Sequence, residues 1–372
     1  MKNATTYCLF SDIPDTPALA EMLEESPSRR CQFGEEKHIG FRPPVAGEDY
    51  ALEANRLCMF SVELTKVVLP AKVVKRETDL KIAEAEEKHD RKLADAEKRE
   101  IKETVRAHLL SQSHQVSEQV DVWCDRERSL LVIDASSEKK IEDILNTLRA
   151  TLGTLRVVPL ATQESAAEAL TRWLGQGRPD PAHWQFSGSC KMVGREDSST
   201  VTFDKAQLAF ETEAPDAGED IGKMGPTPEV EACLDQGRIC TEARFGVEEV
   251  GEFVLTNGLV LKSIKPWAET PKADTDDLQE AKRLNYEAQC VVTYGLIAHV
   301  IDELRTYLGE ASLDEEDLVG IDDNASQESL ATEDEMDQRE PAPAANDEIE
   351  DTNEARAGED EEAPAEEGDA LA

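Results

Sequence analysis

The chain has 372 residues, with 80 acidic residues against 40 basic ones and a formal net charge of −40. This length suits two or three modest domains or one large one. The amino-terminal stretch lacks the apolar core of a signal peptide and no uninterrupted apolar run of membrane-spanning length occurs, so we predict a cytoplasmic protein without membrane contacts.

The acidity is concentrated at the carboxyl end. Residues 310–372 contain 25 acidic and two basic residues, a net charge of −23, which leaves −17 for residues 1–309. A segment so acidic and so poor in apolar residues cannot bury enough surface to offset its ordering entropy. We therefore predict a folded region over 1–309 and a disordered acidic tail over 310–372.

Eight cysteines are distributed singly along the chain, mostly inside apolar runs such as "YCLF" and "AQCVVTYGL". No CxxC or CxH spacing occurs, so we expect buried, reduced thiols rather than zinc ligands or disulfides. No metal site and no cofactor are predicted.

The first half of the chain alternates strand and helix patterns. "TTYCLF" and "RLCMFSVELTKVVLP" predict strands, with a helix, "TPALAEMLEES", between them. Residues 71–110 contain no Gly or Pro and are dominated by Ala, Glu, Lys and Arg, which predicts one long helix, or two with a slight break. "VSEQVDVWCD", "SLLVIDAS" and "TLRVVPL" predict further strands, alternating with the helices "SEKKIEDILNTLRATLG" and "ESAAEALTRWLGQG".

The second half continues the mixture. A hairpin is predicted over 251–264, because Asn257-Gly258 lies between two apolar runs. Residues 209–228 resemble a surface insertion, and helices are predicted over about 276–308. The predicted class is α+β or mixed α/β, with several mixed sheets and a long charged helix.

Cations are concentrated on the predicted long helix. On one continuous helix that advances about 100° per residue, the eight basic residues between 81 and 110 fall in a sector about 120° wide. Two interpretations remain open: an ordinary solvated helix with pairs such as Asp95–Arg99, or a cationic ridge that contacts the phosphates of a polyanion. The eight residues are Lys81, Lys88, Arg91, Lys92, Lys98, Arg99, Lys102 and Arg106.

Catalytic motifs are missing from the sequence. It contains no P-loop, GxGxxG, HExxH or GxSxG, and its six histidines are scattered. Asp134, at the end of a predicted strand, is the best single carboxylate for a metal-dependent nuclease, but such a site needs several carboxylates that converge in space. A turn or helix-cap role is the commoner one for such an aspartate, so we expect no enzymatic activity.

Longer strings resemble the recombination-associated RdgC family. They include "KVVLPAKVV" before a charged helix, "SLLVIDASSEKKIEDILNTLRATLGTLRVVPL", "EVEACLDQGRICTEARF" and "TNGLVLKSIKP", in order over residues 1–309. The resemblance implies a homodimeric ring, closed head-to-tail or by two-fold symmetry, with double-stranded DNA in a positively lined central hole. It also implies sequence-independent binding, association with the nucleoid, and competition for DNA with a RecA-type recombinase.

The resemblance also implies site residues. Arg91 and Lys92 match positions that are basic in relatives, and five further residues of the ridge accompany them as implied DNA contacts: Lys88, Lys98, Arg99, Lys102 and Arg106. Further DNA contacts are implied at Lys72, Lys75 and Arg76, beside Pro70, and at Lys205 and Gln207.

Two features depart from the family pattern. His114 stands where relatives have an aromatic residue at an exposed tip, which implies a different gate or dimer contact there. The acidic tail has no counterpart in the relatives, which implies DNA binding that is weaker or more regulated.

Three functional hypotheses follow. The first is a non-enzymatic, sequence-independent DNA-binding ring that restrains recombination. The second is a metal-dependent exodeoxyribonuclease, and the third is an acidic DNA mimic that binds basic proteins.

Overall fold

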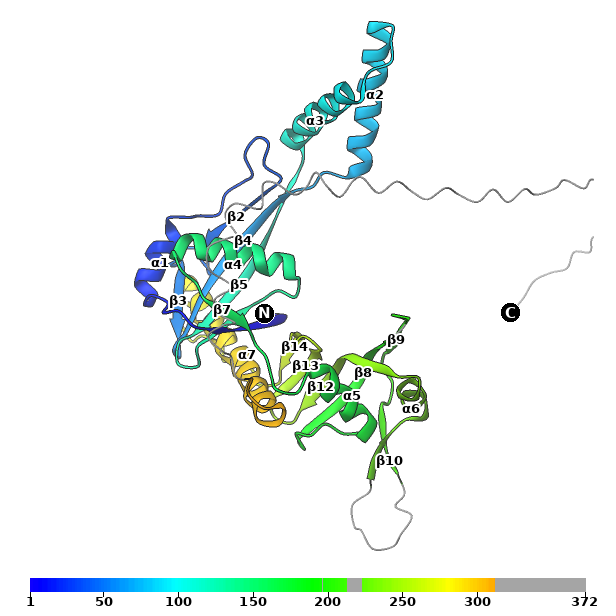
Figure 1. Ribbon diagram of the computed structural model, residues 1–372. Coiled ribbons are helices and arrows are strands. Elements are labelled where there is room, and N and C mark those ends of the chain that lie inside the picture. The colour runs from blue at the N-terminus through cyan, green and yellow to red at the C-terminus, as the bar shows by residue number, and fades with distance from the viewer. Residues whose placement is uncertain (196, 213–222, 312–372) are drawn as a thin grey trace, which may run out of the picture. The chain divides into compact units, whose positions relative to one another are not determined.

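The computed structural model describes residues 1–195, 197–212 and 223–311 (Figure 1). An α+β fold is confirmed, with seven helices among the described residues. None of them is both long enough and apolar enough to cross a membrane. The helices are α1 (Thr16–Glu24), α2 (Ala71–His89), α3 (Asp95–Gln112), α4 (Glu138–Leu152), α5 (Ala166–Gln176), α6 (Pro228–Asp235) and α7 (Leu278–Leu308).

Twelve strands form one large sheet, where several sheets were predicted. Its order is β2-β4-β5-β6-β1-β14-β13-β12-β8-β9, with β3 paired to β4 and β7 paired to β1, and these strand pairs are antiparallel. The strands are β1 (Asn3–Leu9), β2 (Lys37–Arg42), β3 (Ala51–Ala54), β4 (Leu57–Val67), β5 (Gln115–Asp125), β6 (Leu130–Ile133), β7 (Val157–Pro159), β8 (Trp184–Gly194), β9 (Thr200–Phe203), β12 (Arg238–Val247), β13 (Gly251–Thr256) and β14 (Leu261–Pro266).

A separate two-stranded ribbon, β10 (Ala209–Thr212) and β11 (Lys223–Pro226), lies in the predicted insertion over 209–228. Residues 213–222 of that insertion lie outside the described residues. So does most of the predicted acidic tail, because the described chain ends at residue 311.

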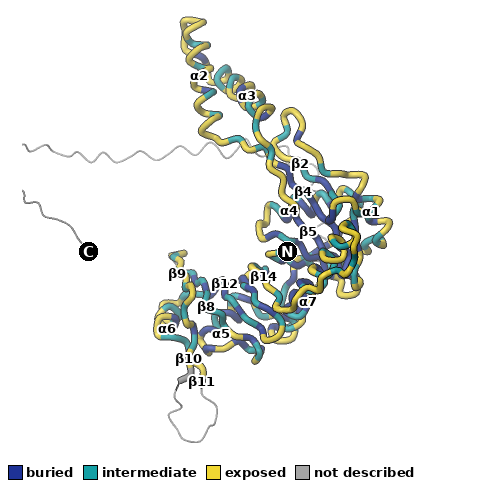
Figure 2. Tube along the Cα trace, turned by 180° about the vertical axis from the view of Figure 1, so that it is seen from behind, coloured by how far each residue is buried: buried dark blue, intermediate teal, exposed yellow. Residues whose placement is uncertain are grey.

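The central strands are apolar on both faces because both faces are covered. Successive side chains of a strand point to opposite faces. In β6, Leu130 and Val132 join the core that contains α7, whereas Leu131 and Ile133 join the core beneath α1 and α4. Figure 2 shows β4 as mostly buried in consequence. In β5, residues 120–125 are mostly buried, whereas residues 116–119 are exposed. Aromatic rings fill the core between α5 and β8, β12 and β13: Trp184 and Phe253 pack edge to face with ring centroids 5.1 Å apart.

The predicted hairpin over 251–264 is confirmed, but its turn is longer than an Asn-Gly turn. The Thr256 N–H donates to the Val260 carbonyl at 3.1 Å, and Leu259 adopts a left-handed φ of +57°. The loop is therefore residues 257–260, with the strained position two residues after Asn257. The helices predicted over about 276–308 are a single helix of 31 residues, α7.

The eight cysteines are unpaired, and six of them are buried. Burial raises the pKa of the Cys124, Cys190 and Cys290 thiols to about 12, which keeps them protonated and unreactive near neutrality. The expectation of buried thiols is thus confirmed for six of the eight cysteines, and none of the eight forms a disulfide.

Candidate nucleic-acid interface

The predicted long helix is a helical hairpin, α2 followed by α3, whose two helices pack against each other (Figure 1). Few side chains are buried between them: Thr78, Leu93, Val105 and Leu110. Figure 2 shows that the remaining surface of the hairpin is largely exposed, and many of its residues are charged. A thin apolar seam of this kind leaves most cations of the segment available to solvent.

Asp90 ends α2. It adopts a left-handed φ of +49°, and its N–H donates to the Glu86 and Glu87 carbonyls. Asp tolerates this conformation better than most residues that have a Cβ. The turn is then held by side chains, because Glu86 accepts a hydrogen bond from the Leu93 N–H at 3.0 Å and Glu97 accepts one from the Ala94 N–H at 2.9 Å.

Arg91 belongs to this turn. Its guanidinium donates two hydrogen bonds to the Glu97 carboxylate, at 2.7 and 2.9 Å. These hydrogen bonds are the main cause that lowers the pKa of Glu97 to about 2. Arg91 therefore stabilises the hairpin, whatever else it contacts. Lys92, its neighbour in the turn, is exposed and has no ion-pair partner among the described residues.

The prediction of a single continuous ridge is wrong, because residues 90–94 form a turn between two helices. The sector of about 120° assumed one uninterrupted helix, and the turn removes the angular relation between α2 and α3. On α3 alone, Lys98, Arg99, Lys102 and Arg106 still lie within about 100° of arc. On α2, Lys81 and Lys88 lie on one side of the helix, two turns apart. Lys72 and Arg76 lie on roughly the opposite side of the same helix.

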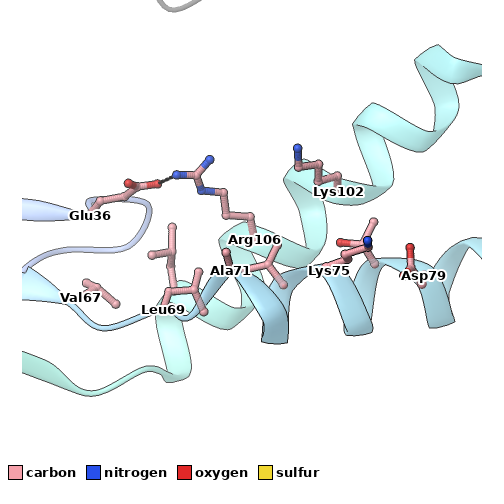
Figure 3. A pocket seen from close by; sticks show the side chains of 11 residues that line it. Glu36, Val67, Leu69, Ala71, Lys75, Asp79, Lys102 and Arg106 are labelled. Carbon is pink, nitrogen blue, oxygen red and sulfur yellow. Dashed lines mark ion pairs between the residues drawn. The ribbon is translucent and has the colours of Figure 1, made fainter. Parts of the chain in front are cut away.

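Chain reversal instead brings together cations from the two helices. A pocket of about 600 Å³ lies between α2 and α3 where the hairpin joins the sheet (Figure 3). Lys75 of α2 and Lys102 and Arg106 of α3 border it. The floor is apolar and includes Val67, Leu69, Val74 and Leu110. Lys75 also borders a shallow hollow of about 430 Å³ that is shared with Lys72 and Arg76. We call these five basic residues, Lys72, Lys75, Arg76, Lys102 and Arg106, the basal cluster.

Most of the basal cluster is available for a ligand. Within the described part of the chain, Arg106 pairs with Glu36, whereas the other four cations have no carboxylate within ion-pairing distance. Lys72, Lys75, Arg76, Lys102 and Arg106 are all exposed. Exposed cations without partners attract phosphate more strongly than neutralised ones, because no carboxylate has to be displaced first.

Glu36 is a site residue that the sequence did not reveal. It lies just before β2, and its carbonyl accepts a hydrogen bond from the Val67 N–H at 2.8 Å, which holds this segment beside the start of the hairpin. The sequence separates Glu36 from Arg106 by 69 intervening residues, so no local spacing could have paired them.

The remaining predicted site residues lie apart from the basal cluster. Lys205 and Gln207 lie in the loop between β9 and β10, where Gln207 Nε2 donates to the Ala209 carbonyl at 3.0 Å. Both are exposed. His114 is exposed where α3 leads into β5, and its carbonyl accepts from the Val68 N–H at 2.9 Å. The far turn of the hairpin is formed by residues 90–94 instead, so the structure places His114 at the hairpin's base.

Asp134 has a structural role. Its Oδ1 accepts hydrogen bonds from the backbone N–H groups of Lys2, at 3.1 Å, and Asn3, at 2.9 Å. These contacts fix the start of β1 beside β6. The Asp134 carboxylate therefore accepts hydrogen bonds from backbone N–H groups, which agrees with a structural role. The segment that it holds is the start of a strand, whereas the sequence suggested a turn or a helix cap.

Comparison with known proteins identifies the family of this chain. The family model described as "Putative exonuclease, RdgC" matches residues 1–214. A recombination-associated protein RdgC of Actinobacillus pleuropneumoniae serotype 3 is 34% identical over 290 residues, which cover 77% of this chain and 90% of that protein. The proteins of the same name from Haemophilus influenzae strain PittGG and Mannheimia succiniciproducens are each 28% identical, over 83% of this chain and 97% of theirs.

The class is thus a recombination-associated α+β protein with a highly charged helical hairpin. The chain belongs to the RdgC family.

Proposed function

We propose that this protein binds double-stranded DNA without sequence preference and thereby restrains recombination. The observation that supports it best is the basal cluster: Lys75, Lys102 and Arg106 border the pocket between the two helices, and Lys75 shares the adjoining hollow with Lys72 and Arg76. Apart from Arg106, these cations have no ion-pair partner among the described residues. Contacts to phosphate position a protein on DNA but read no sequence. An exposed set of Lys and Arg side chains therefore suits non-specific binding.

A homodimeric ring around the duplex is part of the proposal. The chain as a whole is strongly acidic, so a few phosphate contacts in each subunit must suffice. Encirclement supplies the missing affinity, because a closed ring leaves DNA only by opening or by sliding off an end. The long-range repulsion is limited by screening, since the Debye length is about 8 Å at physiological ionic strength. Such a ring would be a cytoplasmic protein associated with the nucleoid, where it would compete with a RecA-type recombinase for DNA.

The test neutralises the two lysines that border the pocket from opposite helices. Lys75→Gln with Lys102→Gln should weaken binding to a duplex of random sequence by about tenfold or more at low salt. It should also reduce the slope of log K against log salt by about 1.8, because each phosphate contact contributes about 0.9. Fluorescence anisotropy at four or more salt concentrations measures both quantities.

The matched control removes the same charge elsewhere. Lys139 on α4 and Lys282 on α7 are exposed and lack ion pairs among the described residues. Lys139→Gln with Lys282→Gln should leave the salt slope unchanged. Equal losses in the two double variants would mean that only net charge matters, and the basal cluster would then not be the contact surface.

Ring closure has its own test. A complex formed on circular duplex should resist dilution into competitor DNA, and should dissociate when the circle is cut once. Identical lifetimes on circular and linear DNA would contradict encirclement while leaving the basal cluster intact as a binding surface.

We further propose that the binding is not accompanied by nuclease activity. End-labelled duplex should remain intact with Mg²⁺ or Mn²⁺ present, and label release would favour the exonuclease hypothesis instead. The DNA-mimic hypothesis predicts no retention of DNA at low salt even after removal of the acidic tail.

A further inference from the structure

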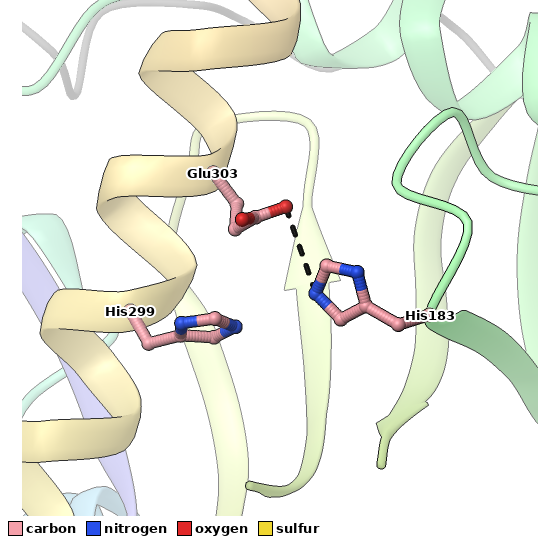
Figure 4. Close-up of side chains that lie close together, drawn as sticks. All are labelled: His183, His299 and Glu303. Atoms are coloured by element: carbon pink, nitrogen blue, oxygen red, sulfur yellow. Dashed lines mark ion pairs between the residues drawn. The ribbon is translucent and has the colours of Figure 1, made fainter.

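Two histidines and a glutamate that are far apart in the sequence converge beside α7 (Figure 4). His299 and Glu303 are one turn apart on α7, and His183 comes from the segment between α5 and β8. The Nε2 atom of His183 lies 3.6 Å from Glu303 Oε2. The two imidazole rings have centroids 5.7 Å apart. One donor atom from each residue lies within 4.8 Å of both others.

These donor atoms are buried and have no hydrogen-bond partner. His183 Nε2, His299 Nε2 and Glu303 Oε2 are all inaccessible to solvent, and none of them makes a hydrogen bond within the described residues. Buried polar atoms are paired in the great majority of cases, so three unpaired ones that face one another require a physical explanation. A shared ligand that accepts all three lone pairs supplies one.

We propose that His183, His299 and Glu303 form a binding site for a divalent transition-metal ion of the Zn²⁺ class. Zinc–nitrogen and zinc–oxygen bonds of about 2.0–2.2 Å in tetrahedral geometry separate the ligand atoms by about 3.3 Å. The 3.6 Å pair is close to that spacing, and the His299 donor lies within 4.8 Å of both atoms. Imidazole donors select Zn²⁺, Co²⁺ or Ni²⁺ over Mg²⁺ and Ca²⁺, which prefer oxygen ligands alone.

The fold holds the three side chains in place. His183 is followed by Trp184, whose ring is buried against Phe245 and Phe253, so the segment that bears His183 is fixed to the sheet. The same segment is anchored by an ion pair of 2.5 Å between Asp180 and Arg172.

On α7, the neighbours Val300, Ile301 and Leu304 are buried. Their burial orients the turn that presents His299 and Glu303. A metal bound here would therefore join α7 to the segment before β8. Its three protein ligands leave one coordination position for water, and this inference does not depend on DNA binding.

The test uses full-length protein freed of metal with a chelator. Zn²⁺ is titrated in competition with a chromophoric chelator, and Co²⁺ is titrated while its visible d–d absorption is recorded. We expect one strong site per chain, a tetrahedral Co²⁺ spectrum, and a melting temperature that rises with Zn²⁺. His183→Ala, His299→Ala and Glu303→Gln should each weaken Zn²⁺ binding by at least about tenfold.

The control is His108→Ala, because His108 is exposed on α3 and lies outside the cluster. It should bind Zn²⁺ as the unaltered protein does, and weak binding by surface and tail carboxylates is common to all variants. Circular dichroism checks that each variant is folded. Site variants that bind Zn²⁺ as the control does would overturn the proposal. So would a wild-type protein without a tetrahedral Co²⁺ spectrum, which decides the matter even if a variant misfolds.

Discussion

Asp125, at the end of β5, is a charged residue buried in the sheet, and its hydrogen bonds explain why that is tolerated. Its Oδ1 accepts from the N–H groups of Glu127 and Arg128 at 2.9 and 3.0 Å, and its Oδ2 accepts from the Tyr294 hydroxyl at 2.6 Å. Burial raises the pKa of Tyr294, so the hydroxyl remains a donor at any ordinary pH. The pair ties α7 to the central sheet.

Tyr294→Phe should lower the free energy of unfolding by about 1–3 kcal/mol, because it leaves a buried carboxylate oxygen without its donor. Phe keeps the edge-to-face packing on Trp123, whose ring centroid lies 6.4 Å away, so little packing is lost. Urea denaturation measures the difference. The matched control is Tyr307→Phe, at a hydroxyl-bearing ring that is 42% exposed and should change stability by less than about 0.5 kcal/mol. Equal values for the two variants would refute the role of the hydrogen bond.

Arg91 and Glu97 allow a prediction about pH. Since the pKa of Glu97 in the folded protein, about 2, lies below its ordinary value of about 4.3, the pair supports the hairpin fully above that ordinary value. The support is lost as the pH falls toward 2. Arg91→Gln should raise the pKa of Glu97 toward the ordinary value, as measured by NMR titration of the carboxyl carbon. Lys92→Gln removes a neighbouring charge but no hydrogen bond to Glu97, so it should change the pKa of Glu97 much less than Arg91→Gln does. An unchanged pKa in Arg91→Gln would disprove the assigned cause.

At the scale of elements, the α2–α3 hairpin changes how its charges should be tested. A double change of Arg91 and Lys92 to Glu, which the continuous ridge suggests as a probe of DNA binding, would also place a second carboxylate against Glu97 and open the turn. Lys92 is exposed and has no ion-pair partner among the described residues, so it can be changed alone.

Lys92→Glu should weaken DNA binding and reduce the salt slope by about 0.9, the contribution of one phosphate contact. This result would mean that the far turn of the hairpin, residues 90–94, contacts DNA together with the basal cluster. Anisotropy titrations over a range of salt provide the measurement, and hydrogen exchange of the hairpin amides shows whether the turn is preserved. A slope equal to that of the unaltered protein would confine the interface to the base of the hairpin.

For the whole molecule, the acidic tail should oppose DNA binding. The folded chain continues through Glu310, because the Gln163 side chain donates to the Glu310 carbonyl at 3.0 Å. Truncation therefore belongs after residue 311, which removes 24 acidic and two basic residues. A tethered polyanion is present at high effective concentration and can compete with phosphate for the basal cluster.

The truncated protein should bind duplex DNA more tightly than the full chain at low salt, and the difference should shrink as screening increases. Affinities of both proteins at 50 and 200 mM salt, on the same duplex, measure it. The comparison variant replaces the tail by an uncharged Gly/Ser segment of equal length, which separates charge from bulk. If all three proteins bind alike at both salt concentrations, the tail does not compete with DNA.

The sequence alone determined the features that depend on local patterns. The strand β4, the hairpin of β13 and β14 and the helix α7 follow from apolar periodicity and turn residues within a few positions of one another. Extended similarity along residues 1–309 was enough to indicate the family. These signals are local or cumulative, so they survive without knowledge of which segments meet.

Tertiary structure decided where the chemistry lies. No Gly or Pro interrupts residues 71–110, yet α2 ends at Asp90, where Leu93 is buried and the Glu86 and Glu97 side chains accept hydrogen bonds from the backbone of the turn. Because the chain reverses there, the basic residues do not form one continuous ridge, and Lys75 instead lines the same pocket as Lys102 and Arg106. His183 and His299 are far apart in the sequence, and they meet only because α7 packs beside the segment before β8. Both sites arise from long-range packing, which local patterns do not encode.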